Sequence, residues 1–203
     1  MKIQESGRSM IEMLGVLAIV GVLSVGGMRI YAQAMQKYRI QKVSSEVIDT
    51  IQHIRKFYAG SYMREGVGKY NNLHTFSLKD GIDVTAFEKS GDHLIHAMSD
   101  TVEVTECSRY SAGDGEAFCI FLYNMDREAC AELLAQNWSG KLVAVGVLGG
   151  REETGILDSA GNKGRVDKSD GALVAYDGSL PIPLGDVAER CSTNGNTVFF
   201  KMR

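Results

Sequence analysis

The first long apolar run of the chain lies close to its N-terminus. Residues 10 to 28 read MIEMLGVLAIVGVLSVGGM, and Glu12 is the single charged residue among these 19 positions. At a rise of about 1.5 Å per residue, a helix of this length spans about 28 Å, close to the thickness of a bilayer core. The pattern therefore predicts a membrane-spanning helix. Its carboxylate suggests a function, because an ionisable group is costly inside a membrane.

The apolar pattern changes to a helical repeat after residue 28. Apolar side chains then recur at steps of three and four, and these are Ile40, Val43, Val47, Ile51, Ile54 and Tyr58. Such spacing predicts an amphipathic helix over residues 29–58 with one apolar stripe. No proline interrupts this region, so we expect one continuous helix of about fifty residues. Gly60 is a natural end point for it.

The remaining residues, 61 to 203, predict a head that mixes helix and strand. Residues 61 to 116 are rich in turn-forming residues and carry only weak elements. Apolar runs predict strands at residues 117–123, 141–148, 172–176 and 197–202. A helix is predicted at residues 126–137, where Asp126 can cap the first turn. We therefore expect an α+β fold, with the long N-terminal helix packed on an antiparallel sheet.

Charge is distributed unevenly along the chain. The net charge of -3 does not favour a nucleic-acid partner. Residues 29 to 56 hold six basic residues against two acidic ones, whereas residues 57 to 203 hold 14 of the 22 basic and 21 of the 25 acidic residues. A basic helix thus joins an acidic head. Taken alone, the basic flank favours a cytoplasmic head, by the positive-inside rule.

All four cysteines follow the apolar segment, and these are Cys107, Cys119, Cys130 and Cys191. They form no CxxC pair, so neither a zinc knuckle nor a thioredoxin-like site is predicted. An even number of cysteines in an exported domain fits two disulfides, with three pairings open. Four buried thiols are the alternative. The disulfide interpretation places the head outside the cytoplasm, against the charge rule.

No catalytic constellation stands out in the sequence. GxSxG, P-loop, GxGxxG and HExxH motifs are absent, so neither an enzyme nor a cofactor is predicted. His93 and His96 have the spacing of two metal ligands on one helical face, but no third ligand accompanies them, and a surface pair is favoured over a metal site. Trp138 is interpreted as a core residue.

Three interpretations of the N-terminal segment compete. A secretory signal peptide has its apolar region at residues 13–25 and its cleavage near Gly26 or Gly27, and a plain membrane anchor is not cleaved. The third rests on the residues Gly7-Arg8-Ser9-Met10-Ile11-Glu12. These resemble the type IV prepilin signature, in which a glycine precedes the cut and the fifth mature residue is glutamate. The short leader MKIQESG and the apolar run that follows agree with it.

The resemblance implies that a membrane prepilin peptidase cuts between Gly7 and Arg8 and that the new amine is N-methylated. It divides the chain into a leader (1–7), a membrane and assembly helix (8–28), a stalk (29–60) and a head (61–203). It also implies that Glu12 meets the Arg8 ammonium of a neighbouring subunit during assembly, a pairing that low dielectric favours. Arg8 stands where the family usually has Phe or Met, which bears on methylation more than on cleavage.

The resemblance further implies a structural subunit that inserts in the inner membrane and joins other pilin subunits in an extracellular filament, the type IV pilus. A pseudopilin of a type II secretion system, in a periplasmic pseudopilus, is a close alternative. A membrane-anchored or secreted enzyme with an ordinary signal segment is the alternative from another class. The type IVb branch resembles this chain in the placement of its C-terminal cysteines, and that likeness pairs Cys130 with Cys191 and Cys107 with Cys119.

Replacement of Gly7 tests the processing site. We expect Gly7→Val to leave the leader attached, because the peptidase must accept a backbone with almost no side chain beside the cut. The intact mass of membrane-extracted protein measures this. A variant still trimmed at Arg8 would show that the assigned site is wrong. A wild-type protein that begins near Met28 would instead support a secretory signal.

Overall fold

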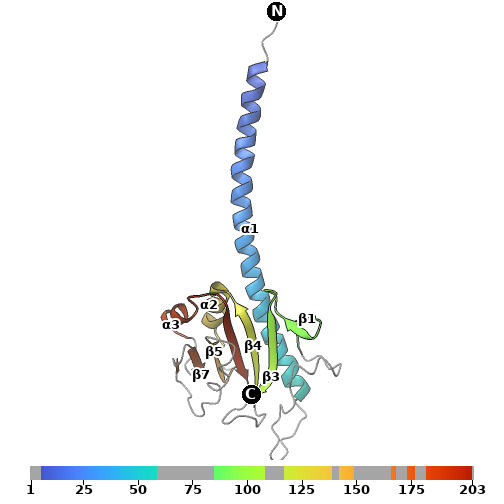
Figure 1. The fold of residues 1–203 in the computed structure, drawn as a ribbon, viewed down its shortest axis with the longest axis vertical. Helices are drawn as coiled ribbons and strands as arrows, with labels where there is room; N and C mark the ends of the chain where they lie inside the picture. The colour runs from blue at the N-terminus through green and yellow to red at the C-terminus, as the bar shows by residue number, and fades with distance from the viewer. Residues whose placement is uncertain are drawn as a thin grey trace, which may run out of the picture. The chain divides into compact units, whose positions relative to one another are not determined.

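The described part of the chain forms two compact units. The computed structural model describes residues 6–58, 85–107, 117–138, 142–148, 166–167, 173–176 and 182–202 (Figure 1). The first unit comprises residues 1–39 and the second comprises residues 40–203. A long helix, α1 (Ser6–Phe57), contributes to both. Residues 1–5 of the predicted leader and the turn-rich residues 59–84 and 108–116 lie outside the described residues.

In the first unit, α1 is a regular helix with an exposed apolar surface. The helix has 52 residues, so the predicted continuous helix is confirmed. Its large apolar side chains between Met10 and Met28 are 52–75% exposed. By length and composition α1 can cross a membrane, with a mean hydropathy of 2.0 over its most apolar window. An apolar surface of this extent requires lipid or protein around it.

In the second unit, the last turns of α1 pack against a sheet. Five of the six side chains of the predicted stripe are at most 4% exposed, and these are Ile40, Val43, Val47, Ile51 and Ile54. They belong to the same core cluster as the inward-facing side chains of the sheet, and the half-buried Tyr58 packs against that cluster. The predicted amphipathic helix is therefore confirmed. Its predicted end at Gly60 lies outside the described residues.

Eight described strands form one sheet in which every pair is antiparallel. They are β1 (Glu88–Ser90), β2 (His93–Ile95), β3 (Thr101–Cys107), β4 (Ala117–Met125), β5 (Ala144–Leu148), β6 (Val166–Asp167), β7 (Leu173–Tyr176) and β8 (Asn196–Met202). Their order across the sheet is β1-β2-β3-β4-β8-β5-β7-β6. The last strand of the chain therefore lies between β4 and β5, inside the sheet (Figure 1). The expected α+β fold is confirmed.

The central strands β4 and β8 are buried on both faces. Ile120 of β4 and Phe200 of β8 pair in register and lie in the cluster that includes the α1 stripe. Phe121 and Phe199 also pair, and they lie in a second cluster on the opposite face. Every side chain from residue 117 to residue 122 is at most 4% exposed. Burial on both faces explains why this stretch, AFCIFL, shows no polar alternation.

Two short helices flank the central strands. The first, α2 (Arg127–Ala135), begins where the sequence predicts, and Oδ1 of Asp126 accepts a hydrogen bond from the N–H of Ala129 at 2.7 Å. Trp138 follows α2 in the core at 1% exposure, where its Nε1 donates to the Leu133 carbonyl at 2.7 Å. The second helix, α3 (Leu184–Arg190), precedes β8. The interpretation of Trp138 as a core residue is confirmed.

The sequence pattern predicted only part of the sheet. It did not predict β6 or α3, and it assigned only weak elements to the residues that form β1, β2 and β3. β1 and β6 have three and two residues, too few to show an alternation. β3 does alternate, because Val102 and Val104 are buried while Glu103 and Thr105 are half-buried. The remaining predicted strands coincide with β4, β5, β7 and β8 to within a few residues.

A disulfide joins the two short helices. Cys130 of α2 and Cys191, at the end of α3, are bonded with a Cα–Cα distance of 5.7 Å and a sequence separation of 61. This is the pairing that the family likeness implied. Cys119 also belongs to a disulfide. The side chain of Cys107 lies outside the described residues, so its pairing with Cys119 stays a prediction.

Loss of the Cys130–Cys191 bond should destabilise the head. A closed loop of this length contributes about 4 kcal/mol in the loop-entropy model, and removal of native disulfides typically costs about 2–5 kcal/mol. We expect a loss in that range for Cys130→Ser. Urea unfolding followed by the fluorescence of Trp138, the one tryptophan of the chain, measures it.

A double variant provides the control for this prediction. Because Cys130 and Cys191 share one bond, Cys130→Ser/Cys191→Ser should lose about as much stability as Cys130→Ser alone. An unfolding midpoint of Cys130→Ser equal to that of the wild type would show that the bond contributes no stability.

Candidate functional site

The predicted processing and assembly residues lie near the beginning of α1. Gly7 and Arg8 fall in its first turn, and Glu12 lies one turn further on, at an exposed position next to exposed Ile11 and Met13. The three residues lie within about 8 Å of one another along the helix axis. The side chains of residues 6–9 lie outside the described residues.

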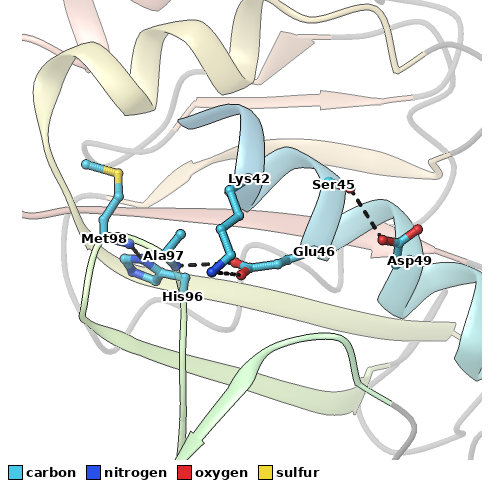
Figure 2. Close-up of polar contacts among 7 residues, drawn as sticks. All are labelled: Lys42, Ser45, Glu46, Asp49, His96, Ala97 and Met98. Atoms are coloured by element: carbon cyan, nitrogen blue, oxygen red, sulfur yellow. Dashed lines mark hydrogen bonds and ion pairs between the residues drawn. The ribbon is translucent and has the colours of Figure 1, made fainter. Parts of the chain in front are cut away.

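A cluster of polar contacts joins α1 to the turn between β2 and β3 (Figure 2). We call it the α1–sheet junction, and its residues are Lys42, Glu46, His96, Ala97 and Met98. Its centre is Glu46, which is only 7% exposed. One carboxylate oxygen of Glu46 accepts a hydrogen bond from the N–H of Ala97 at 3.3 Å, and the other lies 3.7 Å from Nζ of Lys42. Burial raises the pKa of Glu46, and the contacts with Ala97 and Lys42 oppose that rise.

Two further polar side chains of α1 hold other parts of the head. Thr50 is fully buried, and its hydroxyl oxygen accepts a hydrogen bond from the N–H of Ala86, just before β1. Ser44 donates its hydroxyl hydrogen to the side-chain oxygen of Gln136, at the end of α2, at 2.7 Å. Together with Glu46, these residues give α1 polar contacts with three separate segments of the head. Such directional contacts fix how the helix is placed on the sheet, which apolar packing alone does not.

His96 forms the sheet side of the junction, in the turn between β2 and β3. It is 2% exposed, and both of its ring nitrogens are engaged. Nδ1 accepts a hydrogen bond from the N–H of Met98 at 3.2 Å, and Nε2 lies 3.0 Å from the Tyr123 carbonyl. A carbonyl only accepts, so Nε2 carries a proton, and because Nδ1 is itself an acceptor the ring is neutral. Burial lowers the pKa of His96, and the Tyr123 carbonyl and the charge of Asp100 act against this.

Asp100 closes the turn that carries His96. Its carboxylate accepts hydrogen bonds from the N–H of Thr101 at 2.6 Å and from the side chain of Asn124 at 2.7 Å. Partial burial tends to raise the pKa of Asp100, but these hydrogen bonds and the nearby His96 outweigh it, so that pKa lies below its ordinary value. Within the turn, Ser99 adopts a left-handed backbone with φ of 68°. The turn is thus fixed by its own polar contacts.

The junction has the properties of a structural contact. A catalytic base needs a free nitrogen lone pair or a nearby reactive group, and both nitrogens of His96 are occupied by backbone groups. Across the described residues, no group of three or more His, Cys, Asp and Glu side chains could hold a metal ion. The sequence placed His93 and His96 on one helical face, which is wrong because His93 lies on strand β2. The prediction that both are surface residues is also wrong, because His96 is buried.

A small polar cleft lies beside the loop between α3 and β8. Its volume is about 240 Å³, and Arg190, Ser192, Thr193 and Asn194 contribute to its lining. Ligand pockets usually measure about 300–1,000 Å³ and are mainly apolar, so this cleft does not resemble one. Asn194 already accepts a hydrogen bond from the N–H of Arg127 at 3.1 Å. We therefore assign the cleft no binding role.

The sequence analysis did not predict the α1–sheet junction, and its N-terminal site residues stay a prediction. The signal for Glu46 was available, because this acid lies between Val43 and Val47, inside the apolar stripe. An acid there must be buried and needs a partner. The identity of that partner could not be read from the sequence, because Ala97 donates through its backbone from 51 residues away.

Comparisons with known proteins show a distant likeness to solved structures. No protein-family model matches the sequence, and no curated protein matches it. The crystal structure of type IV b pilin from Salmonella typhi matches with a TM-score of 0.49 and 12% sequence identity, over 81% of this chain and 97% of that chain. A likeness this distant does not assign the chain to a family.

Acidification should weaken the head through His96. Its pKa in the folded protein lies below the ordinary value of 6.5, so the unfolded chain takes up a proton first as the pH falls. The contribution of the neutral ring is therefore complete above about pH 6.5, and the free energy of unfolding decreases as the pH falls below it. Urea unfolding from about pH 7.5 to about pH 5.5 measures this slope.

Matched histidine variants separate this effect from other titrating groups. Glu46, whose pKa is raised, has the opposite sign, since protonation of the folded state increases the free energy of unfolding as the pH falls. Glu46 is present in every variant, so the difference between wild type and His96→Gln isolates His96. We expect a flatter slope for His96→Gln and the wild-type slope for His93→Gln, whose side chain is exposed. Equal slopes in all three proteins would contradict the assignment.

Proposed function

We propose that this protein is a structural subunit of a type IV pilus or a related filament, cleaved after Gly7 and assembled through α1. The observation that carries the proposal is the position of Glu12. It is the one charged residue among the exposed apolar residues 10–28 of α1, and it lies fifth from the proposed new N-terminus at Arg8. The proposed partners are a prepilin peptidase, the inner membrane and other pilin subunits.

The exposed apolar part of α1, residues 10–28, is proposed to occupy two environments in succession. Before assembly, residues 10 to 28 are proposed to span the inner membrane, where lipid covers their apolar side chains. After assembly, the same surface is proposed to pack against the helices of neighbouring subunits in an extracellular filament. A surface that is apolar on all sides suits both environments, because it presents no polar face to either.

Glu12 is proposed to select the position of each incoming subunit. After cleavage, Arg8 carries a free ammonium close to the membrane edge, where a charge needs a partner. A carboxylate of a neighbouring subunit at the same depth supplies that partner. Charge pairing in low dielectric is strong and falls as the two charges separate, whereas apolar helix packing tolerates sliding. The pair therefore sets the register between subunits, and N-methylation of the amine leaves its positive charge in place.

Small side chains along the apolar helix support close packing of several neighbours. They recur at every third position as Gly15, Ala18, Gly21, Ser24 and Gly27. Three residues turn the helix by about 300°, so this series winds around the axis and marks no single face. A methyl group added at Gly15, Gly21 or Gly27 would meet nothing within 4 Å, so their surroundings are open to another chain. Small residues allow helices to approach closely in membranes.

The head is proposed to fold without help from the assembly contacts. Its core is formed by the sheet, α2 and residues 40 to 54 of α1, all of which belong to the second compact unit. Glu12 belongs to the first unit. A change at Glu12 should therefore affect assembly without unfolding the head.

Substitution of Glu12 tests the proposal. We expect Glu12→Ala to abolish surface filaments while the subunit remains folded in the membrane, because an unpaired charge buried between subunits costs several kcal/mol, on the order of 3–5. Glu12→Asp should retain some filaments, since it keeps the charge on a shorter side chain. The measurement compares the amount of sheared surface filaments with the amount of membrane-extracted subunit whose disulfides are intact.

Ser24→Ala provides the matched control in the same helix. The Ser24 hydroxyl donates to the Val20 carbonyl of its own helix at 2.7 Å, so its removal takes no charge from a neighbour. Filaments should form normally in this variant. Normal filaments from Glu12→Ala would contradict the assembly role. Loss of the folded subunit itself would indicate that Glu12 serves stability instead.

A further inference from the structure

The part of α1 that directly follows the apolar run carries cations and tyrosines and no acid. Residues 13 to 45 contain no Asp or Glu at all. Within the first unit, this segment presents five exposed side chains that we call the collar, and these are Arg29, Tyr31, Lys37, Tyr38 and Arg39. Tyr31 and Tyr38 are 67% and 59% exposed. The collar thus combines the two kinds of residue that favour a membrane surface.

The helix arranges these side chains around its axis. At about 100° per residue, Tyr31 and Tyr38 are seven positions apart and lie on one face. Arg29, Lys37 and Arg39 are spread over the opposite side. The collar therefore has an aromatic face and a broad cationic face, and cations meet the surroundings over much of the helix circumference. A ring of this kind suits a layer of headgroups better than a single docking partner.

The depth of the collar also matches a headgroup layer. Tyr31 lies about 4–5 Å beyond Met28 along the helix, and Arg39 lies about 16 Å beyond it. The headgroup layer is about 5–8 Å thick on each side, and long basic side chains can extend back toward it. The surface potential of a charged leaflet reaches a further 8 Å or so at physiological salt. Every residue of the collar is thus within reach of lipid charge.

We propose that the collar binds the anionic headgroups of phospholipids at the membrane surface on the side of the head. This inference rests on the proposed membrane insertion of residues 10–28. It also accounts for a conflict in the sequence, because an exported head places this basic flank on the side that the positive-inside rule disfavours. Anionic headgroups compensate these cations there. They would hold the unassembled subunit at a fixed depth, and so hold Glu12 at a fixed level.

The acidic head of another copy is the competing partner. Residues 57 to 203 carry an excess of acids, so they could pair with the collar in a neighbouring chain. Lipid is favoured because the cations begin at Arg29, immediately after the apolar run, and because exposed tyrosines accompany them. A pairing code between chains does not require either feature.

Lipid enrichment around the full-length protein tests the proposal. The chain is reconstituted in vesicles of phosphatidylcholine with a minor share of phosphatidylglycerol, extracted with an amphipathic polymer that retains nearby lipid, and its lipids are measured by mass spectrometry. We expect phosphatidylglycerol to be enriched at least about twofold over the vesicle composition, since each cation near a leaflet gives roughly a fivefold preference for anionic lipid. Enrichment should fall to the vesicle composition at high salt.

Two variants with equal loss of charge make the test specific. Arg29→Gln/Lys37→Gln/Arg39→Gln should lose the enrichment. Arg55→Gln/Lys56→Gln/Lys89→Gln removes three cations from the end of α1 and from β1, and it should keep the enrichment. Trp138 is buried in the core, so a fluorescence equal to that of the wild type in both variants verifies that the head is folded.

The outcomes separate the collar from the proposed function. An inserted wild-type protein without enrichment, or enrichment that survives in the collar variant, overturns the collar and leaves the filament proposal intact. If the wild-type protein shows no lipid enrichment and the collar variant loses self-association, the collar binds a second copy, and the lipid proposal is overturned. A wild-type chain that stays in the aqueous fraction overturns membrane insertion, and the collar with it.

Discussion

The packing of the α1 stripe against the sheet is the contact on which the rest of the head depends. Ile40, Val47 and Ile54 lie in one core cluster with Ile120 and Phe200 of the two central strands. Without the helix, one face of β4 and β8 would be exposed to water, and apolar burial is the dominant stabilising term in a domain of this size. α1 therefore has two different surfaces. Its apolar side chains are exposed over residues 10–28, whereas over residues 40–54 they form one stripe that the sheet covers.

The position of β8 makes the head a strongly non-local structure. The last strand of the chain completes the sheet between β4 and β5, so the centre cannot form until the whole head has been synthesised. The Cys130–Cys191 disulfide lies next to this insertion, because Cys191 precedes β8 by only a few residues. By limiting the freedom of the unfolded chain, the bond favours return of the C-terminal segment to the centre of the sheet.

The α1–sheet junction adds specificity to the apolar contact. Glu46 and Thr50 lie within the buried part of α1, where an unpaired polar group would be costly, and each accepts a backbone hydrogen bond from the edge of the sheet. Apolar side chains tolerate rotation and sliding of a helix, whereas these hydrogen bonds tolerate little of either. His96 holds the turn that presents Ala97 to Glu46. One edge of the sheet is therefore fixed to α1.

Periodicity and spacing in the sequence determined the long helix, its buried stripe, the strands of the sheet centre, the capped helix α2 and the Gly7–Glu12 motif. These features depend on residues close together in the chain, and local pattern records them. The tertiary structure alone decided the strand order, the exposed short strand β1, the burial of His96 and the partner of Glu46. The partner could not be predicted because its donor is the backbone N–H of Ala97. Every residue except proline carries such a group, so only the folded path of the chain determines which one reaches the carboxylate.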